Sequence, residues 1–345
     1  MKLHVVLCLV ALSIAGAAQE RQTIGGKPQL NVPAPPISGS QSEPELTKAL
    51  DGYLEQLAAA ERFSGVVLVA KDGRAIFQKA YGFADRGRRV PNTVTTRFNL
   101  ASVNKQFTMA AIEELKATGK LKDEDTVGAL LPAYPNEQGK RATVQQLLAH
   151  QGGISDFFGP EFAAASPARF RSNADYYAFI APRSLNFEPG TQTRYCNGCY
   201  IVLGEIIAKV SGVPYERFVE ERIFAPRGMN SSGWFASDEI VEAVATGYTS
   251  RSPGSEGTLR ANLFAHGAAG SAAGGGHSTA ADLLAFFKAG PEGRAEGSPV
   301  GMGIAGGAPG TNALVESRGP WLVIVLSNLD PPAASVGVAI IQALK

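Results

Sequence analysis

Two pairs of polar residues have types and spacings that suit nucleophilic chemistry, and the first is Ser102 and Lys105 in the stretch ASVNKQF. Three positions correspond to nearly one helical turn, so both side chains would lie on one helix face. A serine hydroxyl becomes a nucleophile when a base takes its proton, and a lysine can be that base where burial lowers its pKa. The pair therefore predicts an activated serine, with an ordinary helix N-cap as the alternative.

The second pair is Tyr195 and Asn197, in RYCNGCY, directly before an apolar helical stretch. Side chains two positions apart on an extended turn can point into one cavity, where a phenol can relay protons and an amide can hold a substrate carbonyl. The same stretch contains Cys196 and Cys199 at the Cys-x-x-Cys spacing of redox sites and of half a zinc site. No thioredoxin-like strand–helix–strand pattern surrounds them, so Tyr195 and Asn197 are the more informative residues.

The spacing of the histidines argues against a zinc site that would include Cys196 and Cys199. After removal of an N-terminal signal the remaining histidines are His150, His266 and His277, and none has the His-x-x-x-His spacing. We therefore expect no metal, and we interpret His150 as structural. Gly-x-Ser-x-Gly is also missing, which argues against the nucleophile turn of α/β-hydrolases.

Glycines cluster before the last apolar strand, in GIAGGAPGTNALVES. Gly306 and Gly307 in this run would let a substrate approach the backbone. A backbone N–H here could form an oxyanion hole together with the N–H of Ser102. An ordinary glycine-rich turn is the alternative.

The elements that must position these residues form a simple order along the chain. A helix begins near Ser42, and a hairpin turns at Asp72-Gly73, a strong turn signal. Apolar periodicity then predicts helices from Ser102 to Gly119 and further along the middle of the chain. The further helices are expected at 143–150, 173–180, 198–211, 214–223 and 279–288, the strands at 310–317 and 320–330, and a helix at the end. We expect an α+β fold in which strands from both chain ends form one antiparallel sheet, with a mostly helical lobe from the middle.

The 345 residues divide into three segments. Residues 1–17 carry Lys2, a short apolar core and a small-residue cleavage site, which predicts a signal peptide and hence a periplasmic or secreted protein. Residues 18–43 are rich in Pro, Gly, Ser and Gln and predict a flexible linker. A net charge of +1 argues against nucleic acid as a partner, and we expect no stable membrane insertion once the signal is removed.

Several segments together resemble the serine β-lactamase superfamily, in particular the class C β-lactamases, the penicillin-binding proteins and related carboxylesterases and D-peptidases. The similar segments are TTRFNLASVNKQFT, TVQQLLAHQGGISDF, FEPGTQTRYCNGCYIVLGEIIAKVSG and VIVLSNLD, in the family's order. The resemblance implies a β-lactamase/transpeptidase-like domain over 44–345, with a sheet lobe at about 44–105 and 265–345 and a helical lobe at about 106–264.

The resemblance also implies roles. Ser102 would be the nucleophile of an acyl-enzyme mechanism, Lys105 its base, and Tyr195 a second base or proton relay. Asn197 would position the substrate, an ester, amide or β-lactam-like small molecule. Gly306 and Gly307 would line the substrate site, with the N–H groups of Ser102 and Gly307 as oxyanion donors. No metal or organic cofactor is implied.

This chain departs from the family at its third motif. The positions that usually hold Lys or His, a small residue and Gly are Ile304, Ala305 and Gly306. The missing cation normally helps to bind a substrate carboxylate, and the segment after Phe287 is shorter than in relatives. We therefore expect an esterase or general hydrolase rather than an efficient β-lactamase. The alternative is a catalytically impaired relative that binds peptidoglycan fragments or a protein partner. Cys196, where relatives commonly have Ser, is expected to line the cleft.

Overall fold

The computed structural model describes residues 31–250, 257–288, 304–330 and 332–344. The expected signal peptide, linker residues 18–30 and the short segment after Phe287 fall largely outside these ranges. The end of the expected linker is described, and it packs on the domain. Ile37 is buried there, and the hydroxyl of Tyr53 donates a hydrogen bond to the carbonyl oxygen of Pro33 at 2.9 Å.

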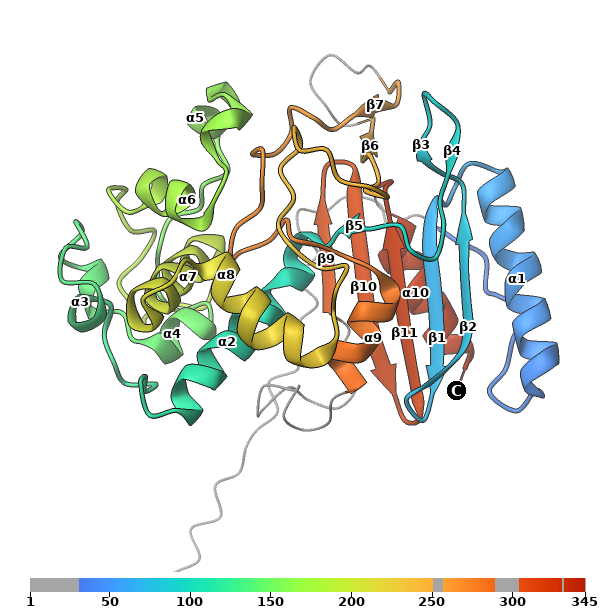
Figure 1. Ribbon diagram of the computed structural model, residues 1–345, viewed down its shortest axis with the longest axis horizontal. Coiled ribbons are helices and arrows are strands. Elements are labelled where there is room, and N and C mark those ends of the chain that lie inside the picture. Colours follow the sequence, from blue (N-terminus) through green and yellow to red (C-terminus); the bar gives the residue numbers. More distant parts are fainter. Residues whose placement is uncertain (1–30, 251–256, 289–303, 331, 345) are drawn as a thin grey trace, which may run out of the picture.

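A five-stranded antiparallel sheet forms the centre of one lobe, in the order β2-β1-β11-β10-β9. Its strands are β1 (Gly65–Lys71), β2 (Arg74–Tyr81), β9 (Ile304–Ala308), β10 (Thr311–Arg318) and β11 (Trp321–Ser327). Strand β1 pairs with β11, so strands from the two ends of the chain meet as the sequence predicted (Figure 1). The β1–β2 turn is the predicted one, and Asp72 and Gly73 both have positive φ, at 51° and 73°. Tight two-residue hairpin turns require such values.

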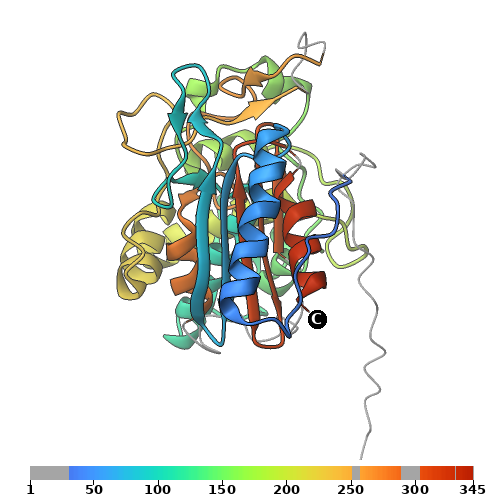
Figure 2. The ribbon, with the colours of Figure 1, turned by 90° about the vertical axis from the view of Figure 1, so that its right-hand side faces the viewer.

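Helices cover both faces of the sheet, so its central strands are apolar on both sides. Helices α1 (Glu43–Ala59) and α10 (Pro332–Ala343) lie on one face, as Figure 2 shows. There they enclose side chains such as Val67 and Val325. On the opposite face, Leu68 and Ile324 belong to the larger core shared with the helical lobe.

The second lobe is built from helices in the middle of the chain. They are α2 (Lys105–Ala117), α3 (Val127–Leu130), α4 (Val144–Leu148), α5 (Pro160–Ala164), α6 (Asn173–Ile180), α7 (Asn197–Ser211) and α8 (Tyr215–Val219), with a π-helical turn at Glu220–Phe224. Helix α7 is buried almost throughout its first three turns and forms the centre of this lobe. Helix α9 (Ala280–Lys288) returns the chain to the sheet, where it contacts β1 and β11. Among the described helices none is long and apolar enough to cross a bilayer.

Short strands connect the lobes around the expected site. Strand β5 (Phe98–Asn99) pairs with β8 (His277–Ser278), directly before the turn that carries Ser102. Two further pairs, β3 (Phe83–Asp85) with β4 (Val90–Pro91) and β6 (Tyr248–Thr249) with β7 (Arg260–Ala261), lie at one end of the sheet (Figure 1). These strands of two or three residues are too short for apolar periodicity to reveal, and the sequence did not predict them.

Candidate active site

Ser102 lies on a tight turn between β5 and α2. Residues Ala101–Asn104 form a 3-10 helix that continues into α2 at Lys105. Ala101 has a φ of +45°, a strained value for a residue with a side chain. Its N–H donates to Oδ1 of Asn99 at 2.9 Å, which helps to hold this conformation. The backbone N–H of Ser102 thus lies in the first turn of a helix, where N–H groups have no intrahelical acceptor.

Lys105 is buried directly beside the serine. Its Nζ lies 3.2 Å from Oγ of Ser102 and 2.8 Å from Oδ1 of Asn197, and it also donates to the carbonyl oxygen of Ala273. Burial lowers the pKa of Lys105 to about 7, although the charge of Asp156 acts in the opposite direction. Near neutral pH a large share of the molecules therefore carries a neutral amine. With two N–H groups directed at Asn197 and Ala273, the lone pair of that amine faces Ser102.

Tyr195 contacts the serine from the other side. Its hydroxyl donates a hydrogen bond of 2.5 Å to Oγ of Ser102. Burial raises the pKa of Tyr195 to about 12, so the phenol keeps its proton near neutral pH. Nζ of Lys105 lies 4.8 Å from the centre of its ring. Of the two roles expected for Tyr195, this arrangement suits a proton relay better than a base.

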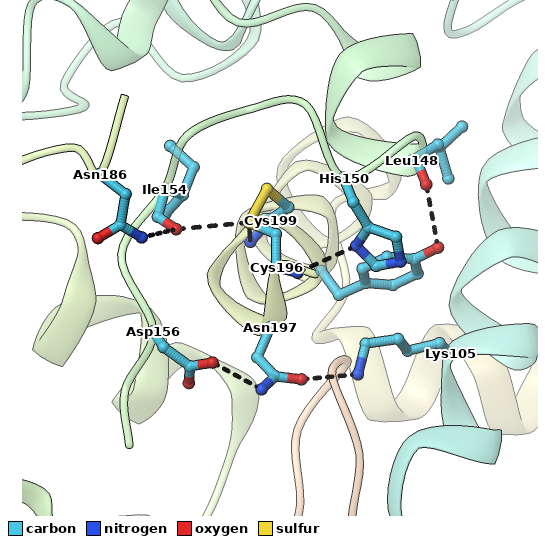
Figure 3. Close-up of a disulfide and its surroundings, with 10 residues drawn as sticks. Lys105, Leu148, His150, Ile154, Asp156, Asn186, Cys196, Asn197 and Cys199 are labelled. Atoms are coloured by element: carbon cyan, nitrogen blue, oxygen red, sulfur yellow. Dashed lines mark hydrogen bonds between the residues drawn. A yellow bond between two sulfur atoms is a disulfide. The ribbon is translucent and has the colours of Figure 1, made fainter. Parts of the chain in front are cut away.

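The turn that carries Tyr195 is held by a disulfide and by a histidine (Figure 3). Cys196 and Cys199 form a disulfide across the start of α7. The N–H of Cys196 donates to Nδ1 of His150 at 3.2 Å, and the His150 ring packs 4.9 Å from that of Tyr195. Burial lowers the pKa of His150 to about 4, so the ring is neutral. His150, expected to be structural, thus supports the candidate site directly.

The expectation that Cys196 lines the cleft is wrong. Its Sγ is bonded to Cys199 and lies 3.4 Å from the carbonyl oxygen of Ile154, in the interior of the helical lobe. Cys196 is 4% exposed and does not contribute to the wall of the cavity described below. The bond to Cys199, fully buried one turn into α7, directs the sulfur inward.

Strand β9 brings its glycines to the serine. A Cβ on Gly306 would lie 2.8 Å from the backbone nitrogen of Ser102 and 2.4 Å from the carbonyl oxygen of Leu100. Only a glycine lets β9 approach this turn so closely. Gly307, the next residue, lines the cavity in front of Ser102. Ser102 and Gly307 thus line the same cavity, and the role of their backbone N–H groups as oxyanion donors stays a prediction.

A cavity of about 270 Å³ opens over Ser102. Aromatic rings form one wall, and small residues of the segment 267–275 form another. The larger side chains that line it belong to Ser102, Asp156, Phe157, Phe158, Phe162, Tyr176, Tyr195, Asn197, Phe235, His266 and His277. Strand β9 contains no Lys, Arg or His, so it brings no cation to the cavity. Ile304, at the position where the sequence analysis noted the missing cation, does not line the cavity. Within the described ranges no three His, Cys, Asp or Glu side chains cluster as metal ligands would.

Of the six residues expected at the site, Ser102, Tyr195, Asn197 and Gly307 line this cavity. Lys105 and Gly306 do not line it and lie next to Ser102. Hydrogen bonds connect Ser102, Lys105, Tyr195 and Asn197, while Gly306 and Gly307 approach through β9. Sequence reasoning missed Asp156, whose Oδ2 accepts a hydrogen bond of 2.8 Å from Nδ2 of Asn197 (Figure 3). The sequence signal that could have pointed to Asp156 is its position shortly after the two glycines of HQGGISDF, a segment that resembles the family. The carbonyl oxygen of Ala273 was also missed, and a backbone acceptor leaves no signal in residue types.

Comparisons with known proteins agree with this arrangement. The family model described as Beta-lactamase matches residues 50–304. Penicillin-binding protein 4* of Bacillus subtilis is 34% identical over 206 residues, 58% of this chain and 45% of that protein. A D-aminopeptidase of Brucella anthropi is 33% identical over 205 residues, 59% of this chain and 38% of that protein. The chain therefore spans less than half the length of these two relatives.

Among solved structures, a penicillin-binding protein from Bacillus halodurans superposes with a TM-score of 0.74 at 26% sequence identity. The superposition covers 83% of this chain and 98% of that one. The likeness confirms the predicted β-lactamase/transpeptidase-like fold, with its antiparallel sheet and its helical lobe.

Proposed function

The chain belongs to the beta-lactamase family, and from this premise we propose that it is a serine hydrolase that cleaves an ester or amide through an acyl-enzyme. The observation that carries the proposal is the contact of Ser102 Oγ with both Lys105 Nζ, at 3.2 Å, and the Tyr195 hydroxyl, at 2.5 Å. A base with a pKa near the working pH and a protonated phenol on the same oxygen can together move a proton from serine to leaving group.

The first step is acylation. Neutral Lys105 takes the proton of Ser102, and Oγ forms a bond to the carbonyl carbon of the substrate. The negative charge that develops on the carbonyl oxygen is stabilised by the N–H groups of Ser102 and Gly307. The bond from the carbonyl carbon to the leaving oxygen or nitrogen then breaks, and the proton passes through Tyr195 to that atom. The products are a serine ester and a free alcohol or amine.

The second step is hydrolysis of the serine ester. A water molecule loses its proton to the same lysine and tyrosine pair and attacks the ester carbon. The bond to Oγ breaks, Ser102 recovers its proton, and the acid is released. Because Ile304 replaces the family's cation, we propose esterase or amidase activity in preference to efficient β-lactam hydrolysis. On its N-terminal signal we also propose that the protein is exported to the periplasm or secreted.

The test is covalent labelling of the serine. A fluorophosphonate probe should label the wild-type chain and fail to label Ser102→Ala, and hydrolysis of short p-nitrophenyl esters should disappear with the label. Ser166→Ala, which removes a serine at the start of a 3-10 turn away from the cavity, is the matched control and should keep both. Undiminished labelling and hydrolysis in Ser102→Ala would overturn the proposal.

The alternative is a non-catalytic relative that binds peptidoglycan fragments or a protein partner, and the loss of the cation at Ile304 is the observation that favours it. It predicts neither labelling nor hydrolysis in the wild-type chain. The hydrogen-bonded set of Ser102, Lys105 and Tyr195 argues against it, because a binding protein needs no lysine buried beside a serine.

A further inference from the structure

One residue with a carboxylate lines the cavity beside the nucleophile in the described part of the chain. This residue is Asp156, and none of the other described residues that line the cavity is an Asp, Glu, Lys or Arg. Its Oδ2 accepts a hydrogen bond from Nδ2 of Asn197 at 2.8 Å, and its Oδ1 accepts one from the backbone N–H of Phe158 at 3.1 Å. Two carboxylate oxygens can accept about four hydrogen bonds, so Asp156 keeps capacity for a ligand.

The wall next to Asp156 is aromatic. Phe157 and Phe162 are buried with their rings 5.0 Å apart, and Tyr176 packs on Phe157 at the same separation. Phe158, 48% exposed, continues this wall to the mouth of the cavity. Apolar rings exclude water and leave the charge of the neighbouring carboxylate poorly screened, so a cation on the ligand would be attracted more strongly there than in open solvent.

The same cavity offers little to an anion. Ile304 stands where relatives have a cation, and the three N–H directions of Lys105 already point at Ser102, Asn197 and Ala273. The two histidines of the wall do not supply a charge either. Burial lowers the pKa of His277 to about 4 and also lowers that of His266. A carboxylate on the substrate would therefore meet Asp156, while the N–H groups of Lys105, the neighbouring cation, are already engaged.

We propose that the preferred acyl donor carries an ammonium group next to its carbonyl and an aromatic or other apolar side chain. An amide or ester of an α-amino acid, or a short peptide with a free amino terminus, has this chemistry. The inference rests on the proposed function and adds to it a specificity-determining residue, Asp156, which binds the ammonium group. An α-amine is two bonds from the carbonyl carbon. Hydrogen bonds connect Asp156 through Asn197 and Lys105 to Ser102, and Figure 3 shows the first two of them. Asp156 and Ser102 also line the same cavity.

Asp156 has a second possible role, because it also orients Asn197. A pair of substrates separates the two roles. Phenylalanine 4-nitroanilide, in its D and L forms, carries the ammonium group, and 3-phenylpropionic acid 4-nitroanilide has the same ring and leaving group without it. The measured quantity is the ratio of kcat/KM for the amino substrate to that for the des-amino substrate. A change in the position of Asn197 or Lys105 affects both substrates and cancels in this ratio.

In the wild-type enzyme we expect a ratio of at least about ten for the better enantiomer, which corresponds to about 1.4 kcal/mol. Asp156→Asn should lower the ratio to near one. The ratio should also fall as the pH rises through the pKa of the substrate's α-amine, about 8, because only the ammonium form pairs with the carboxylate. Glu221→Gln is the matched control. It removes a carboxylate from the π-helical turn Glu220–Phe224 that pairs with Arg217 outside the cavity, and it should leave the ratio unchanged.

Failure of the inference differs from failure of the proposed function. Hydrolysis of both substrates with a ratio near one, or an equal loss on both in Asp156→Asn, would show that Asp156 only positions Asn197. If neither substrate is hydrolysed and Ser102 is not labelled, the hydrolase proposal fails. Calorimetric binding of phenylalaninamide and 3-phenylpropanamide then decides the inference. Tighter binding of the amine that is lost in Asp156→Asn supports it, and equal affinities overturn it.

Discussion

At the scale of single residues, the protonation state of Lys105 decides what the site can do. Its ammonium form has three acceptors, in Ser102, Asn197 and Ala273, which favour the charge. Removing an ammonium from water disfavours it, and the lysine is only 4% exposed. Burial outweighs the opposing charge of Asp156 and lowers the pKa of Lys105 to about 7, so both forms are present near neutral pH. A lysine with a pKa of about 10 would be almost fully charged near neutral pH and would make a poor base.

We therefore predict that kcat/KM rises with pH and levels off above about pH 7. The neutral amine is the active form, and it is gained as Lys105 loses its proton, so activity should fall about tenfold per pH unit below that pKa. Lys105→Arg should lower kcat/KM by about 10²–10⁴-fold and remove this rise, because arginine keeps the charge without releasing its proton. The measurement is the pH dependence of kcat/KM for a p-nitrophenyl ester between about pH 5 and pH 9.

Tyr195→Phe provides the comparison for this profile. It removes the hydroxyl that donates to Ser102 and leaves the buried ring beside Lys105. We expect a lower kcat with the rise near pH 7 retained. A profile that lost its rise in Tyr195→Phe and kept it in Lys105→Arg would assign the titrating base to the tyrosine instead.

At the scale of elements, the start of α7 carries two functional side chains on one short turn. Three contacts fix it: the disulfide from Cys196 to Cys199, the hydrogen bond from the Cys196 N–H to His150, and the amide of Asn197 between Lys105 and Asp156. Cys196 also serves as N-cap, because its Sγ accepts from the N–H of Cys199 at 3.0 Å. The disulfide thus stiffens the turn that places Tyr195 on the serine.

We predict that the double variant Cys196→Ser/Cys199→Ser loses about 2 kcal/mol of unfolding free energy, as loop closure over so few residues implies. The Tm should fall by a few degrees. A reductant should lower the Tm of the wild-type chain by a similar amount and leave that of the variant unchanged. The measurement is thermal unfolding by circular dichroism. Thiol titration of the denatured, unreduced protein checks the premise, and free thiols from both Cys196 and Cys199 would contradict it.

Local signals explain what could be predicted at this scale. The Asp72-Gly73 hairpin, helix α6 and the start of α7 follow from turn chemistry and apolar periodicity within a few residues. Ser102 and Lys105 were found because one helical turn brings them together. The contact of Asp156 with Asn197 joins residues 41 positions apart, and the contact of Lys105 with Ala273 joins residues 168 apart. The first contact depends on packing within the helical lobe and the second on how the two lobes pack, and no local pattern specifies either.

At the scale of the whole molecule, the site depends on a sheet closed by both ends of the chain. Strand β9 must lie against the Ser102 turn, and β9 is held by β10, which β11 and helix α10 support from behind. Helix α10 approaches β10 closely through Gly337, where a Cβ would lie 2.0 Å from Cδ2 of Leu314. The last helix of the chain thus determines how well the oxyanion strand is supported, although it lies on the far face of the sheet from the cavity.

This packing predicts that a glycine-to-alanine substitution changes the free energy of unfolding in opposite directions in helices α10 and α1, which lie on the same face of the sheet. At Gly337 an added methyl group would meet Leu314, which is only 2% exposed, and would lie 3.2 Å from Cγ2 of Val325. Gly337→Ala should therefore lower the unfolding free energy by about 1–3 kcal/mol. At Gly52 in α1 a Cβ would have no atom within 4 Å. Gly52→Ala should raise the unfolding free energy by about 0.5–1 kcal/mol through helix propensity.

Urea unfolding of both variants measures the two changes. Equal shifts in one direction would mean that α10 does not dock on β10 through Gly337. If it does dock there, Gly337→Ala should also lose ester hydrolysis at a lower temperature than Gly52→Ala, because loosening α10 releases β10 and, with it, the strand that carries Gly307.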